Sequence, residues 1–232
     1  MKNGSIITIE NLVKSFPIGG GEFTALNSIN LTFAKGEFSG IVGPSGSGKT
    51  TLLNILGSLD TPSRGQTNVL GIMSGQMTPK VSAKLRKQHI GFIFQTYNLM
   101  PVYTVFENVE FPLLLLKMPA AERKKAVLEA LEWVGLSDKI KSKPPQLSGG
   151  ESQRVAIARA MVKKPDLVLA DEPTANLDAE NSHHILQTME KLNKELETTF
   201  VFATHDEKVI GYLRRIIRLE DGKVVSDENI KK

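Results

Sequence analysis

Short apolar runs recur along the chain, and polar or glycine-rich segments separate them. Four runs have the length and content of buried strands, namely residues 38–42, 90–94, 167–172 and 199–204. Continuous apolar strands are typical of parallel sheets that are covered on both faces. The segments between the runs are long enough for crossover helices. The pattern therefore predicts an α/β fold with a mainly parallel sheet.

Helical periodicity fills several of the segments between these runs. Helices are predicted at residues 77–88, 105–118, 120–134 and 179–196. Another helix begins near Thr51, and its apolar face is expected to contain Leu52, Leu53, Ile55, Leu56 and Leu59. Residues 97–147 differ in composition from their surroundings and lie between two core strands. We interpret them as a helical subdomain inserted into a single domain of residues 1–232.

Both ends of the chain carry patterns of antiparallel strands. Residues 5–10 alternate weakly, residues 17–22 favour a hairpin turn, and residues 23–33 look like a further strand pair. Together with a short strand at residues 66–72, they predict an antiparallel β-subdomain at the N-terminus. Near the C-terminus we expect a turn at Asp221 and Gly222 between two strands, and then a frayed polar tail at residues 226–232.

The amino-acid composition favours a globular domain and argues against several other classes of protein. The chain has 232 residues, of which 41% are hydrophobic, and this fits a globular domain with a sizeable core. A net charge of +4 is too small and too scattered to indicate a nucleic-acid surface. The absence of cysteine excludes disulfides and thiolate metal sites. Residues 1–5 lack the apolar core of a signal peptide, and the most apolar run, residues 111–116, is too short to span a bilayer.

A glycine-rich segment after the first buried run fits the pattern G-x-x-x-x-G-K-[ST] at every fixed position. Its glycines let successive N–H groups point towards an anion, and the following helix adds partial positive charge. Lys49 can reach the outer phosphates, and the Thr50 hydroxyl is placed to ligate Mg²⁺. The alternative is a glycine-rich turn that binds nothing. The predicted nucleotide-binding residues are Gly43, Ser45, Gly46, Ser47, Gly48, Lys49, Thr50 and Thr51.

A second informative segment precedes the apolar helix at residues 155–162. Ser148 and Glu151 fit a capping box, S-x-x-E, so one interpretation is simply a well-capped helix. The two glycines inside the box, Gly149 and Gly150, favour a further role. They open the helix N-terminus so that a phosphate can approach the backbone closely.

Polar side chains end three of the buried strands. Gln95 follows one strand, Asp171 and Glu172 close the next, and His205 follows another. Because ligands bind beyond the carboxyl ends of parallel strands, we expect these groups to gather beside the nucleotide. Strand alternation places the two carboxylates on opposite sides, which suits Asp171 to Mg²⁺ and Glu172 to the attacking water. An acidic cap on the following loop is the structural alternative.

These motifs, in this order between about residues 7 and 225, resemble the nucleotide-binding subunit of an ABC transporter. The resemblance implies a P-loop NTPase with a RecA-like core and the cofactors ATP and Mg²⁺. It implies catalytic roles for Glu172, His205 and Gln95, with Thr50, Gln95 and Asp171 on the metal side. It also assigns Phe16 to the adenine ring, whereas the residues alone leave packing within the small sheet as an equal alternative.

The resemblance further implies partners. Asp178 would lie at a dimer contact, and a second copy's ATP would be contacted by Leu147, Ser148, Gly149, Gly150 and Glu151. Two chains would close head to tail around two MgATP as a homodimer. The homodimer would work with an integral membrane permease that carries a periplasmic domain, at the cytoplasmic face of the inner membrane. No nucleic acid is expected as a partner.

Within the family, residues 90–101 and 107–114 look most like the MacB and LolD branch. This branch implies lipoprotein release or the export of macrolides or peptides, and a chain without a fused membrane domain looks more like LolD. The alternative is an FtsE-like ATPase that transmits force to a periplasmic enzyme in cell division without transport. Residues 97–101 and 113–116 are apolar enough for a partner-binding face, or they form the core of the helical subdomain.

Overall fold

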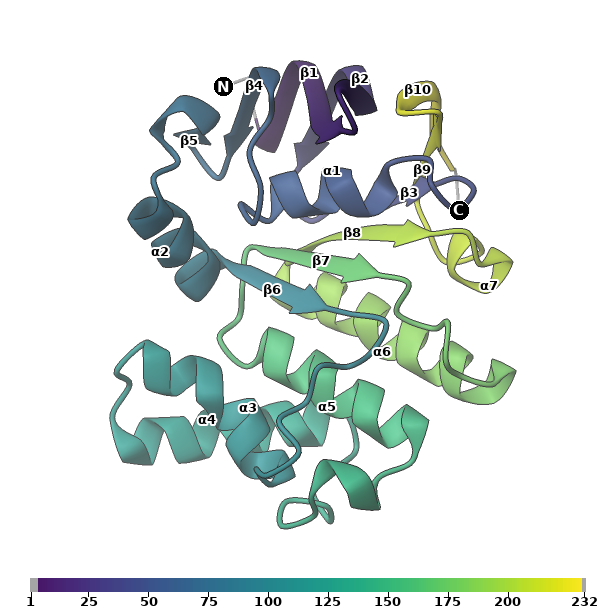
Figure 1. Cartoon of the computed structure of the whole chain (residues 1–232). Coiled ribbons are helices and arrows are strands. Elements are labelled where there is room, and N and C mark those ends of the chain that lie inside the picture. The colour runs from purple at the N-terminus through teal and green to yellow at the C-terminus, as the bar shows by residue number, and fades with distance from the viewer. Residues whose placement is uncertain (1–3, 231–232) are drawn as a thin grey trace.

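A six-stranded sheet forms the centre of the molecule (Figure 1). The computed structural model describes residues 4–230. In sheet order the strands are β10 (Lys223–Asn229), β9 (Arg215–Glu220), β3 (Phe38–Val42), β8 (Thr199–Thr204), β7 (Leu167–Asp171) and β6 (Ile90–Ile93). Neighbouring strands from β9 to β6 run parallel, whereas β10 pairs antiparallel with β9. The mainly parallel α/β sheet predicted from the apolar runs is confirmed.

The central strands read as continuous apolar runs because both of their faces are buried. On β8, Phe200 and Phe202 pack in one hydrophobic core, while Val201 and Ala203 pack in the other. Successive side chains of a strand point to opposite faces, so a sheet between two cores needs apolar residues at every position. The sheet thereby fixes the carboxyl ends of β3, β6, β7 and β8 along one edge.

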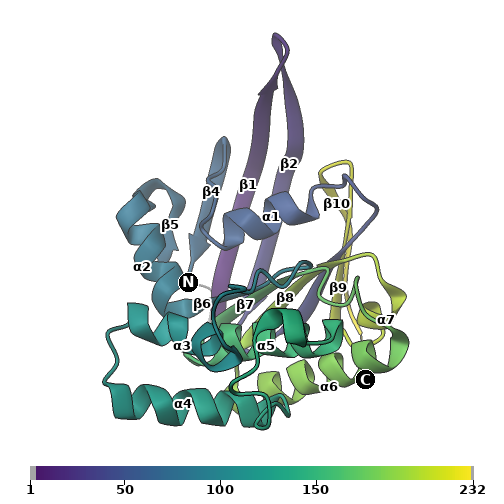
Figure 2. The same ribbon diagram turned by 60° about the horizontal axis from the view of Figure 1, so that its bottom comes forward.

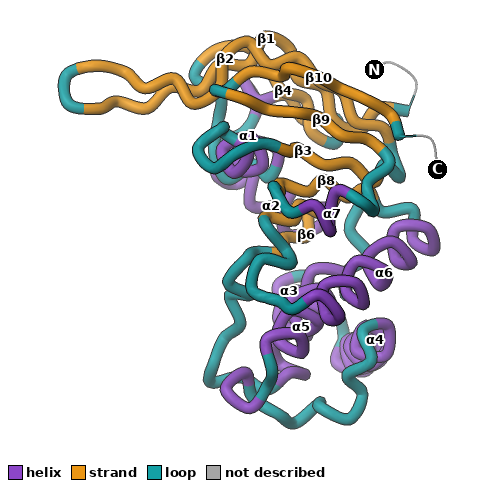
Figure 3. The backbone as a smooth tube through the Cα atoms, turned by 90° about the vertical axis from the view of Figure 1, so that its right-hand side faces the viewer, coloured by secondary structure: helices purple, strands orange, loops and turns teal. Residues whose placement is uncertain are grey.

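An antiparallel sheet lies beyond the second core. Its order is β2 (Gly21–Ala34), β1 (Ser5–Ile18), β4 (Arg64–Val69) and β5 (Ile72–Met73). Residues 23–33 belong to one strand, so the predicted strand pair is wrong. Asn27 and Ser28 resemble a turn, but Ser28 has a φ of 54° where the register between β1 and β2 shifts in a β-bulge. The predicted hairpin turn is confirmed, and this hairpin projects far from the molecule (Figures 2 and 3).

Helices lie on both faces of the six-stranded sheet (Figure 1). Helix α1 (Lys49–Leu56) packs between the two sheets, with α2 (Pro79–His89) at their side. The opposite face is covered by α3 (Val105–Leu115), α4 (Ala120–Trp133), α5 (Gly149–Met161) and α6 (Ala179–Leu196). Shorter helices are Ser74–Gln76, Pro144–Gln146 and α7 (Glu207–Ile210). Within residues 4–230, no helix has the length and apolar content needed to cross a bilayer.

One predicted member of the apolar face of α1 lies elsewhere. Helix α1 ends at Leu56, where Gly57 occupies the C-cap position. Leu59 comes after this end and is 49% exposed, so its placement on the buried face is wrong. Leu59 fits the helical spacing of apolar residues, but the helix ends three residues before it.

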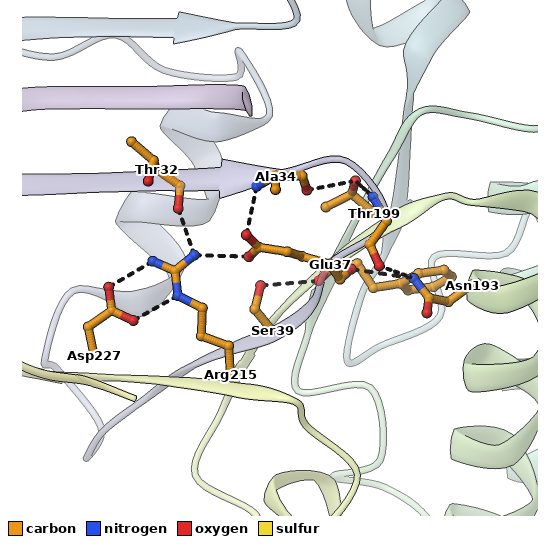
Figure 4. Close-up of polar contacts among 10 residues, drawn as sticks. Thr32, Ala34, Glu37, Ser39, Asn193, Thr199, Arg215 and Asp227 are labelled. Carbon is orange, nitrogen blue, oxygen red and sulfur yellow. Dashed lines mark hydrogen bonds and ion pairs between the residues drawn. The ribbon is translucent and has the colours of Figure 1, made fainter. Parts of the chain in front are cut away.

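Arg215 ties the C-terminal strands to the antiparallel sheet (Figure 4). Its guanidinium donates to the two carboxylate oxygens of Asp227, at 2.7 Å each. It also donates to Glu37 at 2.9 Å and to the carbonyl of Thr32 at 2.6 Å. The hydrogen bond to Asp227 and the nearby carboxylates raise the pKa of Arg215, which outweighs the effect of its burial. The network therefore joins β9, β10 and the end of β2.

This network also explains a departure from the predicted C-terminus. Residues 226–229 form the end of β10 rather than a frayed tail, so that prediction is wrong for them. The polar sequence of these residues gives no strand pattern. The strand depends on the contact between Asp227 and Arg215, which lies 12 residues away in the chain. Residues 231 and 232 lie outside the described residues.

Candidate nucleotide site

A cleft of about 450 Å³ opens at the carboxyl ends of the parallel strands. The predicted residues that line it are Phe16, Ser45, Gly46, Gly48, Lys49, Thr50, Thr51, Gln95, Asp171, Glu172 and His205. Phe23, Ala25 and Ala175 also line this cleft, although no motif in the sequence indicated them. Gly43 and Ser47 belong to the same loop without lining the cleft, and residues 147–151 and Asp178 lie outside it.

At two positions of the loop, neighbouring backbone lies so close that only glycine fits. A Cβ at Gly43 would lie 2.0 Å from the carbonyl oxygen of Leu219. Gly48 has a φ of 103°, and a Cβ there would lie 2.6 Å from the carbonyl oxygen of Ala25. Residues other than glycine rarely adopt such a φ. The carbonyl oxygens that a Cβ would meet belong to the backbone, so they cannot move aside. The loop is therefore packed tightly against both β2 and β9.

The polar groups of the loop converge as a phosphate site requires. Lys49 Nζ donates to the carbonyl oxygens of Gly43 at 2.8 Å and Pro44 at 2.9 Å. The Ser47 hydroxyl is buried and has no hydrogen-bond partner among the described residues. A buried hydroxyl of this kind calls for a partner such as an ordered water molecule. Lys49, which lines the cleft, and the N-terminus of α1 together fit a phosphate group.

Thr50 and Asp171 meet at the base of the cleft. The Thr50 hydroxyl lies 3.0 Å and 3.3 Å from the two carboxylate oxygens of Asp171. Burial raises the pKa of Asp171, and the hydrogen bond from Thr50 acts in the opposite direction. Hydroxyl and carboxylate oxygens are hard ligands of the kind that Mg²⁺ prefers. With Gln95 in the same cleft, these residues fit a magnesium ion beside the phosphates.

Glu172 makes contacts that differ from those of Asp171. Its carboxylate accepts a hydrogen bond from the Thr204 hydroxyl at 3.0 Å and lies 2.6 Å from His205 Nδ1. Its backbone has a φ of 44°, an uncommon conformation that the surrounding contacts must hold in place. An oriented carboxylate beside a histidine at the rim of the cleft is suited to polarise a water molecule.

Gln95 lies in a turn two residues after the end of β6, and its exposed side chain lines the cleft. Its carbonyl oxygen accepts a hydrogen bond from the side-chain amide of Asn176 at 2.9 Å. Asn176 precedes Asp178 in the loop between β7 and α6, so this bond connects two of the predicted motifs.

The Ser148 segment forms the N-terminus of α5. The Ser148 hydroxyl accepts from the Glu151 N–H at 3.2 Å, and the Glu151 carboxylate accepts from the Ser148 N–H at 2.8 Å. The predicted capping box is therefore confirmed, and the bond from Ser148 lowers the pKa of Glu151. Ser148 and Gly149 are exposed. Gly150 is buried, and a Cβ there would lie 2.4 Å from Asn181 Oδ1.

Asp178 caps the neighbouring helix, α6. Its carboxylate accepts from the Asn181 N–H at 2.8 Å and from the Asn181 side-chain amide at 2.7 Å. These hydrogen bonds lower the pKa of Asp178, so the group is ionised at neutral pH. Because Asn181 also lies against Gly150, the N-termini of α5 and α6 are adjacent.

Two aromatic rings stand at the outer end of the cleft. Phe16 and Phe23 lie opposite each other across the hairpin of β1 and β2, and they are 37% and 51% exposed. Lys14 Nζ lies 5.0 Å from the centroid of the Phe16 ring and 2.6 Å from a carboxylate oxygen of Asp60. Exposed rings beside a polar cleft suit the stacking of a base. The position of Phe23 across the hairpin turn from Phe16 was the available signal for this second ring.

Fold and site together define an ATP-binding cassette, and comparison with known families agrees. The sequence model described as ABC transporter matches residues 26–175, so the chain belongs to the ABC transporter family. It is the ATP-binding, ATP-hydrolysing component of this family. The predicted resemblance is confirmed, including the branch that holds LolD and MacB proteins.

Particular relatives place the chain within the family. It is 44% identical to the lipoprotein-releasing system ATP-binding protein LolD of Pseudoalteromonas translucida, over 98% of each chain. It is 41% identical to the macrolide export ATP-binding/permease protein MacB of Burkholderia pseudomallei, over 97% of this chain and 34% of that protein. A dimeric, post-hydrolysis structure of the cassette MJ0796 of Methanocaldococcus jannaschii, bound to ADP and Pi, superposes with a TM-score of 0.89. It shares 42% identity, over 97% of this chain and 99% of that chain.

Proposed function

We propose that two copies of this chain close head to tail around two MgATP and drive an integral membrane permease that has a periplasmic domain. The permease would release lipoproteins or export macrolide- or peptide-like substrates, and the chain would act at the cytoplasmic face of the inner membrane. The LolD and MacB relatives support this choice of substrate classes. The observation that carries the proposal is the capped, exposed N-terminus of α5, which does not line the cleft of its own chain.

A helix N-terminus attracts anions through its free N–H groups and the helix dipole. The phosphate loop already has the N-terminus of α1 in its own chain. In this proposal Ser148 and Gly150 therefore contact the γ-phosphate held by the other copy, and Asp178 lies at the contact between the copies. Loss of the γ-phosphate removes the shared contacts, so the two copies separate after hydrolysis.

Hydrolysis would depend mainly on positioning and charge stabilisation, as phosphoryl transfer generally does. Lys49 and the loop N–H groups would neutralise the outer phosphates, and Phe16 would stack on the base. Glu172 would orient and polarise the attacking water, while His205 would hold the γ-phosphate. The 2.6 Å contact between Glu172 and His205 supports a joint action of these two side chains.

Magnesium fits the same cleft. The Thr50 hydroxyl, the Asp171 carboxylate and the Gln95 side chain are the groups that would hold it, directly or through water. Bound Mg²⁺ would neutralise charge on the phosphate oxygens. The chain's own contribution is to keep Thr50 and Asp171 together, which their hydrogen bond already does in the protein alone.

A second cleft, of about 560 Å³, is suited to receive the membrane partner. Its apolar lining includes Leu59, Phe92, Phe94, Met100, Phe111 and Leu115, and basic side chains at it are Arg86, Lys87, Arg159 and Lys163. Residues 113–116 were expected either to bind a partner or to form the core of the helical subdomain. Leu113 is fully buried in the core, whereas Leu115 is 49% exposed and lines this groove. An apolar surface with basic edges fits a helix that ends in acidic residues.

Cross-linking from this groove tests the proposal. The chain has no cysteine, so Leu115→Cys supplies a single thiol. In native membranes treated with a short thiol-reactive cross-linker, we expect attachment to an integral membrane protein that has a periplasmic domain. Leu128→Cys is the matched control, since Leu128 is a leucine on α4 that is 39% exposed and lies outside the groove.

The identity of the captured protein decides the outcome. A permease supports the proposed transport role, and a partner that belongs to the division machinery supports the FtsE-like alternative. Equal labelling of membrane proteins from both cysteine positions, or none from the groove, contradicts docking at this surface.

A further inference from the structure

The loop that carries Gln95 contains two consecutive residues with unusual backbone conformations. Tyr97 has a φ of 60° and Asn98 has a φ of 49°, both in the left-handed region. Asparagine adopts this conformation fairly readily, but a bulky aromatic residue rarely does. Strain of this kind persists only where the surrounding structure holds the backbone in place, and it gathers at functional sites.

A single side chain holds both residues. Arg159, on α5, donates to the carbonyl oxygen of Tyr97 at 2.7 Å and to that of Asn98 at 2.6 Å. In the described part of the chain, its hydrogen-bond partners are these two carbonyls rather than a carboxylate. Arg159 is half-buried, and this burial lowers its pKa. A guanidinium directed at two successive backbone carbonyls is placed to fix the path of the loop that carries them.

The strained pair lies between the two clefts of the molecule. Gln95 lines the nucleotide cleft, whereas Asn98 and Arg159 line the apolar groove. Arg159 also belongs to the helix whose N-terminus is formed by the Ser148 segment. Only Thr96 separates Gln95 from residues 97 and 98, so the conformation of these two residues sets the path by which the backbone leaves Gln95.

We propose that Arg159 is a positioning residue that holds Tyr97 and Asn98 in left-handed conformations and thereby keeps the Gln95 side chain in the nucleotide cleft. The inference rests on the proposed catalytic role of Gln95. The planar fork of a guanidinium reaches two successive carbonyls, whereas the single ammonium of lysine does not reproduce this geometry. A misplacement of about 1 Å at a reacting centre costs roughly 10²-fold in rate.

The test compares Arg159→Lys, Gln95→Ala and the double variant in the full chain. We expect Arg159→Lys to lower kcat at saturating MgATP by roughly 10- to 100-fold, with KM for ATP changed by less than about twofold. The double variant should be no slower than Gln95→Ala, because both changes remove the same contribution. Amide hydrogen exchange at residues 95–100 should accelerate in Arg159→Lys without a matching change elsewhere.

Arg123→Lys is the matched control. Arg123 also donates to a backbone carbonyl, that of Met118 at 2.6 Å, but it lies on α4 outside both clefts. This control should retain full activity, and thermal unfolding should show that Arg159→Lys is folded.

Two sets of results overturn the inference. If Arg159→Lys retains kcat while Gln95→Ala loses it, or if the two effects multiply in the double variant, Arg159 does not act through Gln95. If Gln95→Ala itself retains full kcat, the proposed role of Gln95 is wrong and the inference falls with it.

Discussion

At the residue scale, adjacent carboxylates at the end of β7 have different surroundings. Asp171 meets the Thr50 hydroxyl, whereas Glu172 meets Thr204 and His205. Strand alternation predicts different surroundings for the two carboxylates, but β7 ends at Asp171 and Glu172 follows it in a left-handed conformation, so the predicted strand is one residue too long. The left-handed backbone of Glu172 has no signal in the sequence, because it depends on partners contributed by β8.

Replacing Glu172 with glutamine tests its proposed role in polarising water. Glutamine has nearly the same shape but cannot accept a proton, so hydrolysis should fall by roughly 10²- to 10⁴-fold. ATP affinity should change little, because the phosphate loop and Phe16 are intact. Phosphate release and equilibrium binding of ATP measure the two effects separately. Glu180→Gln, at an exposed position on α6, should leave both unchanged, and a wild-type rate for Glu172→Gln contradicts the assignment.

Lys163 gives a prediction about pH. Its Nζ donates to the carbonyl oxygens of Arg86, Lys87 and Ile90, and burial lowers its pKa to about 8. In the unfolded chain the pKa is about 10.5, so between these values the unfolded state binds more protons. The contribution of Lys163 to the free energy of unfolding therefore rises with pH across this window, by at most about 1.4 kcal/mol per pH unit.

Unfolding by urea at several pH values measures this contribution. The difference in free energy of unfolding between wild type and Lys163→Met should increase from pH 8 to pH 10. A difference that stays constant, or that decreases as the pH rises, contradicts the placement of this ammonium in a desolvated site.

At the element scale, the sequence predicted those elements that carry their own local signal. Strand β8 and helix α6 were predicted at the bounds that the structure has, because a buried apolar run and a 3.6-residue period identify them directly. Two of the errors lie where a distant contact decides the conformation. The bulge at Ser28 depends on pairing with β1, and the end of β10 depends on Arg215.

The bond between Arg215 and Asp227 can be tested through β10. Asp227→Asn removes the charge but keeps the shape, and we expect a loss of about 1 kcal/mol in the free energy of unfolding. The value is modest because the Asp227 side chain is 36% exposed. Hydrogen exchange at residues 226–229 should accelerate first. Glu228→Gln, at the next position, should change neither quantity, and equal effects of the two variants contradict a specific role for the bond.

At the scale of the whole molecule, the candidate site joins segments that are far apart in the sequence. Gln95, Glu172 and His205 could be predicted to meet, because the carboxyl ends of parallel strands share one edge. Phe23 and Arg159 could not be found in the same way. Phe23 reaches the cleft through the projecting hairpin, and Arg159 acts on a loop that the strand pattern does not place. The roles of Gln95, Glu172 and Arg159 are proposals that the variants above test.

The central claim is that each cleft is completed by the other copy of the chain. The most direct test is the molar mass of Glu172→Gln under saturating MgATP, measured by light scattering during size exclusion. We predict a dimer with ATP and a monomer without it, and a monomer that still binds ATP when Ser148→Arg is added. A monomer of Glu172→Gln at saturating MgATP, or a dimer that survives Ser148→Arg, would contradict the account.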